Sequence, residues 1–291
     1  MSNESQLTII ILSYNSHFWL KKTLQSLKEF YLDVSKTKVR TVVVDNNSTD
    51  PSVAMVKEEF PEVELMELPE NEGFAAGNNH ALRTVTTPYV MLLNSDVELT
   101  AQTRLDELLS YLDTHPQVGI VTPRVELAEG KLDMASHRGE PTVWASLTYF
   151  LGLEKLFPKV PFLSRYHLLS KDFTQVHEIE ACSAAAMMIR SHAMDKVGLL
   201  DDQFFMYAED LDWCKRFREE GFSIVYYPQV TITHHKYKSG LLSSSKPIKA
   251  KTREYFYDTM LQYYDKHYQT KYPRWVRSII KYVVDFKKGA V

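Results

Sequence analysis

The sequence predicts an α/β fold in which a mostly parallel sheet is flanked by helices and followed by a C-terminal helical extension. Three strand-helix alternations precede residue 96, and such alternation implies right-handed crossovers between parallel strands. Each apolar run ends in polar residues, which is typical of strands that finish at one edge of a sheet. Helical spacing of apolar and basic residues returns near the C-terminus. We therefore expect one domain over residues 1–240 and a helical extension over residues 241–291.

The first two units each consist of a strand, a polar loop and a helix. Leu7–Leu12 is a β-branched apolar run, and leucines on one helix face follow it to about Glu29. Val39–Val44 ends in the polar run D-N-N-S-T-D. Pro51, a favourable first-turn residue, then begins a helix to about Phe60.

A third strand and a central strand complete this half of the sheet. Val63–Leu68 is followed by a polar, glycine-containing loop, Asn71–Asn79, which leads into a short helix. Tyr89 begins five apolar or aromatic residues that predict a fully buried parallel strand, and the run stops at the triplet N-S-D of residues 94–96. Ligands of open α/β sheets bind beyond the carboxyl ends of the strands. The loops that should open on this edge contain Asn15, Asp45, Asn71 and Asp96.

The alternation becomes less regular after a helix over Gln102–His115 and a strand over Val118–Val121, so a soft division is placed near Pro123. Residues 140–170 are rich in aromatic and leucine side chains interrupted by prolines. This composition favours either packing beneath an appended lobe or an exposed apolar binding surface. Packing is the preferred interpretation, because apolar clusters on monomers are usually buried.

A second group of acidic and histidine residues follows. Ala181–Ile189 is apolar and rich in small residues, as in a buried strand. The next helix, which should end at Gly221, has three carboxylates in its first turn: Glu209, Asp210 and Asp212. Acids there offset the helix dipole by roughly 0.3–1 kcal/mol each, and three exceed what capping requires. Two short strands, Ile224–Tyr227 and Val230–Thr233, then lead to His234 and His235.

Composition narrows the class of protein. The formal net charge of -3 gives no overall attraction to nucleic acid, so no nucleic-acid partner is expected. The two cysteines, Cys182 and Cys214, are too few for a disulfide framework and favour a reducing, cytoplasmic location, with both packed as small apolar residues. The N-terminus lacks a secretory pattern, and no run approaches the roughly 18 apolar residues of a spanning helix. We expect a protein that is neither secreted nor membrane-spanning.

The residues at the predicted sheet edge suit a nucleotide and a metal ion. Asp96 with a later histidine pair offers carboxylate and imidazole ligands, which suit Mg²⁺ or Mn²⁺ when a substrate diphosphate supplies further oxygens. Gly73 and Gly77 would let the backbone approach a ligand. No loop matches a P-loop or G-x-G-x-x-G, so ATP-type and dinucleotide sites lose their usual support. The side chains able to read a nucleobase and ribose are Asn15, Asp45, Asn71 and Asn78.

Six motifs resemble, in the same order, those of the inverting family 2 glycosyltransferases, which have the GT-A fold. They are I-I-I-L-S-Y-N-S, V-V-V-D-N-N-S-T-D, N-E-G-F-A-A-G-N-N, M-L-L-N-S-D, F-F-M-Y-A-E-D-L-D-W-C-K-R and a late histidine, and they span residues 7 to about 240. The pattern is most similar to rhamnosyltransferase-like members, which use a dTDP-activated deoxysugar and often act on a lipid-linked saccharide. The resemblance implies a GT-A domain with a nucleotide-binding part over residues 1–123 and an acceptor-binding part over residues 124–240.

The resemblance also assigns the donor site. Asp45 becomes the acid that reads the nucleobase, Asp96 a metal ligand, and His234 the histidine near the diphosphate, with His235 left open as its alternative. Asp96 closes the counterpart of the family's D-x-D, in which Asn94 replaces the first Asp. The remaining donor contacts that the resemblance implies are Ser13, Asn15, Asn47, Asn71, Gly77, Asn78, Asn94 and Ser95.

On the acceptor side, the resemblance makes Asp210 the catalytic base. Displacing a nucleoside diphosphate requires a carboxylate that takes the proton of the acceptor hydroxyl, and a cation, Mg²⁺ or Mn²⁺, that neutralises the leaving group. A single base opposite the leaving group implies in-line attack and inversion. Glu209 and Asp212 are expected to support or cap the helix. Ala184 departs from the family's pattern, because many relatives have Gly there.

The implied partners are a dTDP- or UDP-sugar donor and a glycan or polyprenyl-linked saccharide acceptor, as in cell-surface polysaccharide synthesis. Near the C-terminus, apolar residues from Trp275 to Val284 fall near helical spacing among basic residues. Such a helix can lie on the anionic inner face of the cell membrane or dock on the catalytic domain. Membrane contact is preferred, because a polyprenyl-linked acceptor would place the enzyme there.

Two other functions stay open from the sequence. A nucleotidyltransferase on a similar sheet would release pyrophosphate from a nucleoside triphosphate. It calls for a basic, glycine-rich N-terminal loop, which Ile11–Ser16 does not supply. A non-catalytic nucleotide-sugar-binding module would bind donor without turnover, and the intact carboxylate cluster disfavours it.

Overall fold

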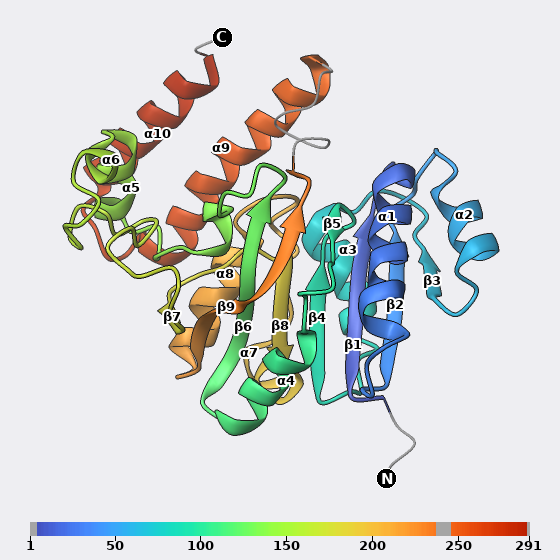
Figure 1. Ribbon diagram of the computed structural model, residues 1–291. Coiled ribbons are helices and arrows are strands. Elements are labelled where there is room, and N and C mark those ends of the chain that lie inside the picture. Colours follow the sequence, from blue (N-terminus) through green and yellow to red (C-terminus); the bar gives the residue numbers. More distant parts are fainter. Residues whose placement is uncertain (1–4, 237–245, 290–291) are drawn as a thin grey trace.

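The structure is a computed structural model that describes residues 5–236 and 246–289, which form a β-sheet covered by helices on both faces (Figure 1). The strands of the described chain are β1 (Leu7–Ser13), β2 (Val39–Asp45), β3 (Glu64–Glu67), β4 (Tyr89–Leu93), β5 (Val97–Glu98), β6 (Val118–Leu127), β7 (His177–Ile179), β8 (Ala186–Arg190) and β9 (Ser223–His234). The α-helices are α1 (His17–Leu27), α2 (Ser52–Glu59), α3 (Gly73–Leu82), α4 (Leu105–Thr114), α5 (Val143–Phe150), α6 (Leu153–Leu156), α7 (Ser191–Val197), α8 (Glu209–Glu219), α9 (Lys246–Tyr268) and α10 (Arg274–Gly289). A π-helical turn, η1 (Lys28–Leu32), and a 3₁₀ turn, η2 (Met134–Ser136), complete the set.

The sheet has the strand order β3-β2-β1-β4-β8-β6-β9-β5, and β7 also pairs with β9. The first four of these strands are parallel, as the strand-helix alternation predicts. β8 runs antiparallel to both β4 and β6, so the sheet as a whole is mixed. The predicted α/β class is confirmed, and the parallel half carries the loops that the sequence singled out.

Two apolar layers hold the helices on the sheet. Along β1, Leu7, Ile9 and Ile11 pack with α1, α2 and α4, whereas Ile10 packs with α3, α7 and α8. Successive strand residues point to opposite faces, so a strand covered on both faces must be apolar throughout. Cys182 and Cys214 are free and buried in the second layer, as packed small residues.

One predicted loop is wrong. The sequence placed a loop over residues 71–79 before a short helix, but α3 already begins at Gly73. Asn71 Oδ1 accepts a hydrogen bond from the Gly73 N–H at 3.0 Å, which starts the helix early. Gly77 then lets α3 approach the sheet, because a Cβ at this position would lie 2.7 Å from Leu12 Cδ1. Tertiary packing therefore extends the helix into a segment whose composition is typical of a loop.

Two strands of the structure, β6 and β9, are longer than the sequence predicts. The strand predicted over Val118–Val121 continues to residue 127, and its register against β9 shifts between Pro123 and Arg124. Pro lacks an N–H for the ladder, and the irregularity accommodates it. The division placed near residue 123 therefore falls inside a strand. The two strands predicted after residue 223 are the single strand β9. The boundary predicted between residues 240 and 241 lies outside the described residues.

The C-terminal helices dock on the rest of the molecule. Tyr263, Tyr264 and Tyr268 of α9 form a buried cluster with Phe204 and Ala208, just before α8. α10 lies beside α9, and Val276 joins the same cluster (Figure 1). No helix in the described parts of the chain is long and apolar enough to cross a membrane.

Candidate functional site

The loops after β1 and β2 are joined by side-chain hydrogen bonds. Asn15 Oδ1 accepts from the Thr49 N–H at 2.7 Å, and the Asn15 N–H donates to Ser48 Oγ at 2.9 Å. Asn15 and Asn47 both have left-handed backbones, with φ of 49° and 65°, which Asn tolerates better than most residues. Asn15 thus braces the two loops, and the exposed Asn47 lies at the tip of the second.

Asp45 ends β2 with one carboxylate oxygen satisfied and the other free. Oδ2 accepts from the Ser48 N–H at 2.8 Å, whereas Oδ1 is buried without a hydrogen-bond partner in the described structure. The residue is only 3% exposed. A buried acceptor without a partner is unfavourable by about 1–3 kcal/mol, and a ligand N–H would satisfy it. This geometry suits the predicted recognition of a nucleobase.

Asn46, which the sequence analysis passed over, ties β2 to the loop before α3. Its Nδ2 donates to Asn71 Oδ1 and to the Gly73 carbonyl, both at 3.0 Å, and its Oδ1 accepts from the Glu72 N–H at 3.0 Å. The residue is almost fully buried. Asn71 is therefore held in place by Asn46, next to the end of β2.

The same loop contacts the segment that leads into α8. The Phe74 N–H donates to the Phe205 carbonyl at 2.7 Å. Between Phe205 and α8, Tyr207 and Ala208 adopt left-handed backbones with φ of 71° and 66°. Non-glycine residues with strained backbone conformations occur preferentially at functional sites. The loop before α3, which the sequence predicts to contact the donor, is thus hydrogen-bonded to the segment that leads into α8.

Gly73→Ala should break this connection. Gly73 has φ of 86°, and a Cβ there would lie 2.3 Å from the Phe205 carbonyl oxygen. We expect a loss of roughly 2–4 kcal/mol in the free energy of unfolding, from steric overlap added to backbone strain. Urea denaturation would measure it. Gly130→Ala is the matched control, because φ is 77° and a Cβ would meet nothing within 4 Å. Equal losses in the two variants would contradict the assigned contact.

Gly77 and Asn78 lie inside α3 and are buried. The structure accounts for Gly77 by packing against Leu12, and Asn78 Nδ2 donates to the Phe74 carbonyl at 2.9 Å. Both residues therefore support the loop from behind. Their predicted donor contacts remain predictions.

Serine hydroxyls join the ends of β1 and β4. Ser13 Oγ and Ser16 Oγ are 2.8 Å apart, and Ser16 Oγ donates to Ser95 Oγ at 3.1 Å. Ser13 is buried, so its hydroxyl finds its partner in Ser16. These serine hydrogen bonds hold the N-S-D turn that follows β4.

Asp96 and His234 face each other across β5 and β9. His234 Nε2 lies 3.1 Å from Asp96 Oδ1 and 3.4 Å from Asn94 Nδ2. Both residues are more than 90% buried. The other ring nitrogen, Nδ1, lies 3.1 Å from Oδ2 of Asp133, a buried residue that the sequence analysis did not identify. The imidazole is therefore held between two carboxylates.

Burial alone would lower the pKa of His234, but hydrogen bonds with Asp133 and Asp96 outweigh it and raise the pKa to about 9. Burial would likewise raise the pKa of Asp133, but His234 and Lys236 hold it well below its ordinary range. Lys236 Nζ lies 3.0 Å from Asp133 Oδ1. Asp133 thus orients His234, as outer carboxylates orient histidine ligands in metal sites.

Once a cation displaces the proton from His234 Nε2, the donor atoms of Asp96 and His234 offer it a partial ligand set. Neighbouring ligands of an octahedral Mg²⁺ at about 2.0–2.1 Å lie about 2.9 Å apart, close to the 3.1 Å between Oδ1 and Nε2. No group of three or more His, Cys, Asp or Glu suited to a metal occurs among the described residues. Other ligands would have to come from diphosphate and water, as Mg²⁺ commonly accepts.

His235 points elsewhere. Its Nε2 lies 2.8 Å from Glu98 Oε2, and its ring stacks on Trp19 with centroids 4.5 Å apart. Of the two histidines left open by the sequence, the structure brings His234 to Asp96.

Asp210 stands at the start of α8 and is paired with Arg138. Its Oδ2 accepts from Arg138 Nη2 at 2.6 Å, and its Oδ1 accepts from the Leu211 N–H at 2.7 Å. The side chain is 14% exposed, so part of it is accessible to solvent. Each carboxylate oxygen keeps a further lone pair for an acceptor hydroxyl. Arg138, which lies 72 positions away, was not predicted from the sequence.

Glu209 differs from its neighbour. Burial, followed by the charge of Asp210, raises the pKa of Glu209 to about 8, and its Oε2 has no hydrogen-bond partner in the described residues. A carboxyl group that is mostly neutral near pH 7 is poorly suited to be the base. The structure therefore favours Asp210 over Glu209 for that role.

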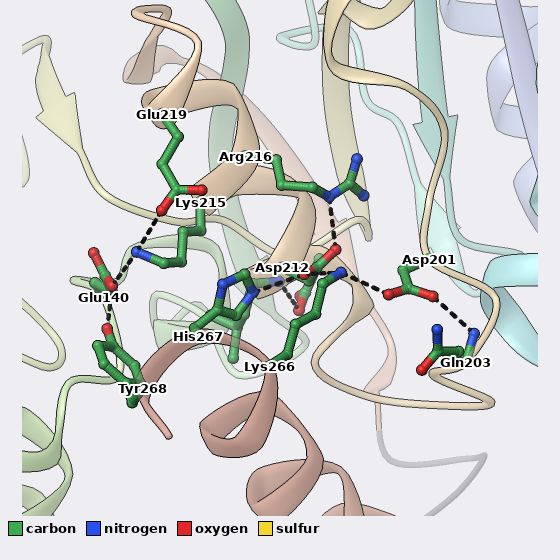
Figure 2. A network of polar contacts seen from close by, with 12 residues as sticks. Glu140, Asp201, Gln203, Asp212, Lys215, Arg216, Glu219, Lys266, His267 and Tyr268 are labelled. Carbon is green, nitrogen blue, oxygen red and sulfur yellow. Dashed lines mark hydrogen bonds and ion pairs between the residues drawn. The ribbon is translucent and has the colours of Figure 1, made fainter. Parts of the chain in front are cut away.

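Asp212 is fully buried and connects α8 to α9 (Figure 2). Its oxygens accept from Arg216 Nε at 2.8 Å, Lys266 Nζ at 2.6 Å and His267 Nε2 at 2.7 Å. Burial would raise the pKa of Asp212, but these hydrogen bonds and charges lower it to about 2. The sequence predicts that Asp212 supports or caps the helix. In the structure it supports α8 through contacts with Lys266 and His267 of α9, which the sequence could not show.

A second acid, Glu140, forms hydrogen bonds with both α8 and α9. Glu140 lies two residues beyond Arg138 and accepts from Lys215 Nζ at 2.7 Å and Arg218 Nη2 at 2.5 Å. Tyr268 of α9 also donates to it (Figure 2). The C-terminal extension thus contacts Glu140 and Asp212, which lie two residues after Arg138 and Asp210 respectively.

A family model described as "Glycosyl transferase family 2" matches residues 8–174, more than half of the chain. The chain belongs to glycosyl transferase family 2. The matched range contains Asp45, Asp96, Asp133 and Arg138, whereas Asp210 and His234 lie beyond it. Glycosyltransferases of this kind have the GT-A fold, and the mixed sheet with flanking helices described above is that fold.

Curated relatives are similar over most of the chain. An N-acetylglucosaminyl-diphospho-decaprenol L-rhamnosyltransferase from Mycobacterium tuberculosis is 22% identical over 79% of this chain and 76% of its own length. A low-salt glycan biosynthesis hexosyltransferase, Agl10, from Haloferax volcanii is 25% identical over 79% of this chain and 67% of its own length.

Solved structures share the fold at low identity. The mannosyltransferase PcManGT from Pyrobaculum calidifontis, in complex with GDP-Man and Mn²⁺, has a TM-score of 0.59 at 17% identity, over 99% of this chain and 71% of that one. GalNAc-T7 with UDP, GalNAc and Mn²⁺ has a TM-score of 0.58 at 12% identity. The match covers 88% of this chain and 48% of that one.

Proposed function

We propose that this glycosyltransferase is a metal-dependent, inverting hexosyltransferase that moves rhamnose from dTDP-rhamnose to a glycan or polyprenyl-linked saccharide in cell-surface polysaccharide synthesis. The observation that carries the proposal is the contact between Phe74 and Phe205, which joins the predicted donor loops to the helix of Asp210. The similarity to a rhamnosyltransferase named for a diphospho-decaprenol acceptor supports the sugar and the acceptor class.

For the donor, we assign Asp45 to the nucleobase, through its unpartnered Oδ1. Ser13, Asn15, Asn47 and Asn71 would line the loops around the nucleotide, with Asn94 and Ser95 at the end of β4. This division corresponds to a nucleotide-binding part over residues 1–123 and an acceptor-binding part over residues 124–240.

For the leaving group, we assign Asp96 and His234 as protein ligands of Mg²⁺ or Mn²⁺. The cation would neutralise negative charge that develops on the departing diphosphate. Asp133 fixes the ring of His234 from the opposite side, at 3.1 Å, and so sets which nitrogen faces Asp96. Neighbours crystallised with Mn²⁺ support a divalent metal.

For the acceptor, we assign Asp210 as the general base. Asp210 takes the proton of the acceptor hydroxyl as its oxygen bonds to the anomeric carbon, and the bond from that carbon to the diphosphate breaks with its electron pair. Attack from the side opposite the leaving group inverts the configuration. Arg138 holds Oδ2 and so aims the carboxylate.

A nucleotide and metal screen tests the donor. Thermal shift and sugar release would be measured with dTDP-, UDP- and GDP-sugars, with and without Mn²⁺ or Mg²⁺. A ligand that binds only the folded protein stabilises it by about 2.7 kcal/mol at a hundredfold excess over its dissociation constant. A metal-dependent response to dTDP-rhamnose is expected. A response to another nucleotide sugar would replace the donor, and pyrophosphate release from a triphosphate would indicate a nucleotidyltransferase.

Asp96→Ala should abolish the metal-dependent part of that response, because the cation would lose its only carboxylate ligand among the assigned residues. Sugar transfer should fall by at least about 10²-fold, as expected for loss of leaving-group stabilisation. Asp96→Asn, which preserves the shape of the buried side chain, separates this effect from unfolding. Asp202→Ala, an exposed acid, is the control. Full metal-dependent activity in both Asp96 variants would contradict the assignment.

We also place the protein in the cytoplasm, in peripheral contact with the inner face of the cell membrane through its C-terminal helix. The basic and apolar residues of α10 support this, together with the lipid-linked acceptor in the name of the Mycobacterium tuberculosis relative.

A further inference from the structure

The exposed apolar residues of this molecule are concentrated in two places. Of the seventeen large apolar side chains that are exposed in the described chain, fourteen lie in residues 144–162 or in α10. The segment between Gly139 and Tyr166, which we call the lobe, contributes Trp144, Leu147, Tyr149, Phe150, Leu151, Leu156, Phe157, Val160 and Phe162. α10 contributes Trp275, Ile279, Tyr282, Val283 and Phe286. Five of these nine lobe residues are aromatic, so the interpretation that the aromatic residues of this segment are packed is wrong for those five.

The pattern along α10 shows more apolar surface than docking requires. Val276, Ile280 and Val284 recur every four residues, and Val276 and Val284 are buried, so this stripe faces the protein. A second stripe, from Trp275 to Phe286, is 37–72% exposed. A helix that only packs on a domain needs one apolar stripe. The second stripe is available to another surface.

The lobe and α10 lie on the same side of the molecule (Figure 1). Val143, at the start of α5, packs on the same buried cluster as Val276 and Ile280. The fourteen exposed residues can therefore act as one surface, which we call the docking face.

The charge of these segments differs from that of the whole chain. Residues 141–162 and 271–289 contain eight Lys or Arg and two acids, whereas the whole chain has a net charge of -3. One acid, Glu154, is buried and bound to His167 at 2.7 Å. In the described structure, Lys155, Lys159, Arg274 and Lys287 form no ion pair. A basic, apolar surface complements an anionic lipid bilayer, which offers apolar chains below negative headgroups.

We propose that the lobe and α10 together dock on an anionic membrane, with the docking face inserted at the headgroup boundary. This proposal adds the lobe to the membrane contact already proposed for α10. If α10 alone met the membrane, the nine exposed apolar side chains of the lobe would remain in water. Exposed apolar side chains concentrated in this way are typical of an interaction site.

The lobe also connects the docking face to the base. Its two ends meet where the Gly139 N–H donates to the Tyr166 carbonyl at 2.8 Å, and a Cβ at Gly139 would lie 2.1 Å from the Arg165 carbonyl oxygen. The residue before Gly139 is Arg138, which holds Asp210. If the proposed function is right, a membrane-seated lobe delivers a lipid-linked acceptor beside the base.

Vesicle flotation tests the docking face. We expect full-length protein to float with vesicles of phosphatidylcholine and phosphatidylglycerol, and much less with phosphatidylcholine alone. The lobe variant L151E/L156E/F162E and the helix variant W275E/Y282E/F286E should each lower the partition coefficient roughly tenfold or more, because three exposed apolar side chains are replaced in each. F18E/V34E, at residues of similar exposure elsewhere, should float like the parent. Equal flotation of the parent and the lobe variant would overturn the proposal.

Fluorescence quenching locates each part separately. In Trp275→Phe protein, vesicles with brominated acyl chains should quench Trp144, and in Trp144→Phe protein they should quench Trp275. The double variant, which retains Trp19 and the buried Trp213, gives the background. Unquenched Trp144 would overturn the role of the lobe. A lipid-free dimer that both triple variants dissociate would instead identify a second copy as the occupant. Neither assay contains donor, metal or acceptor, so failure here leaves the proposed reaction untouched.

Discussion

Asp210→Asn is expected to lower kcat by about 10²–10⁴-fold while leaving donor binding intact. The amide keeps the size of the side chain and an oxygen for Arg138, but it cannot take a proton from the acceptor hydroxyl. The rate of sugar transfer would be measured at saturating donor, with the donor found in the nucleotide screen. The size of the loss follows from the general contribution of a positioned base.

Asp202→Asn is the matched control, because this acid is exposed and lies eight positions before Asp210 on the approach to α8. It should transfer sugar at the parent rate. Donor-induced thermal stabilisation should be the same in both variants and the parent, which separates catalysis from binding. An Asp210→Asn protein that keeps its shift and loses less than about tenfold in kcat would show that the base lies elsewhere.

Asp212→Ala is expected to lower the free energy of unfolding by about 3–5 kcal/mol. The change leaves Arg216, Lys266 and His267 around an empty, buried position, and breaking a buried ion pair from one side has this magnitude. Asp212→Asn, which keeps the shape, should lose less. Urea denaturation would measure both, with Asp195→Ala on α7 as the exposed control.

The pH dependence of the Asp212→Asn effect has a defined sign. The carboxyl pKa is about 2 in the folded protein and about 3.9 in an unfolded chain, so the folded state favours the ionised form. Its stabilisation is complete above about pH 5 and is lost as the pH falls toward 2. The stability difference between parent and Asp212→Asn should therefore shrink below about pH 4. A difference that grows at acidic pH would contradict the assigned network.

The Asp212 and Glu140 contacts give the C-terminal extension a role near the site. α9 contacts α8 through Lys266 and His267, and Tyr268 contacts Glu140, two residues after Arg138 (Figure 2). Loss of these contacts would free α8, the helix whose first turn carries Asp210. The C-terminal extension is therefore bound to the same segments that hold Asp210 and Arg138.

Local patterns were enough to predict the α/β class and to place the candidate site residues at the ends of parallel strands. The apolar runs of β1, β2 and β4 are short, buried on both faces and followed by polar turns, and these signals lie within about ten consecutive residues. The same signals placed Asp45 and Asp96 at strand ends, because a strand followed by a crossover helix returns its neighbour in parallel.

Only the tertiary structure decided which side chains meet. Asp133 lies 101 positions from His234, and Arg138 lies 72 positions from Asp210, in a stretch without clear periodicity. Asn46 resembles any turn residue until its three hydrogen bonds to residues 71–73 are seen. The exposure of the lobe likewise depends on what packs over it, and composition cannot report that. Secondary structure follows from spacing along the chain, whereas partners and exposure follow from how distant segments pack together.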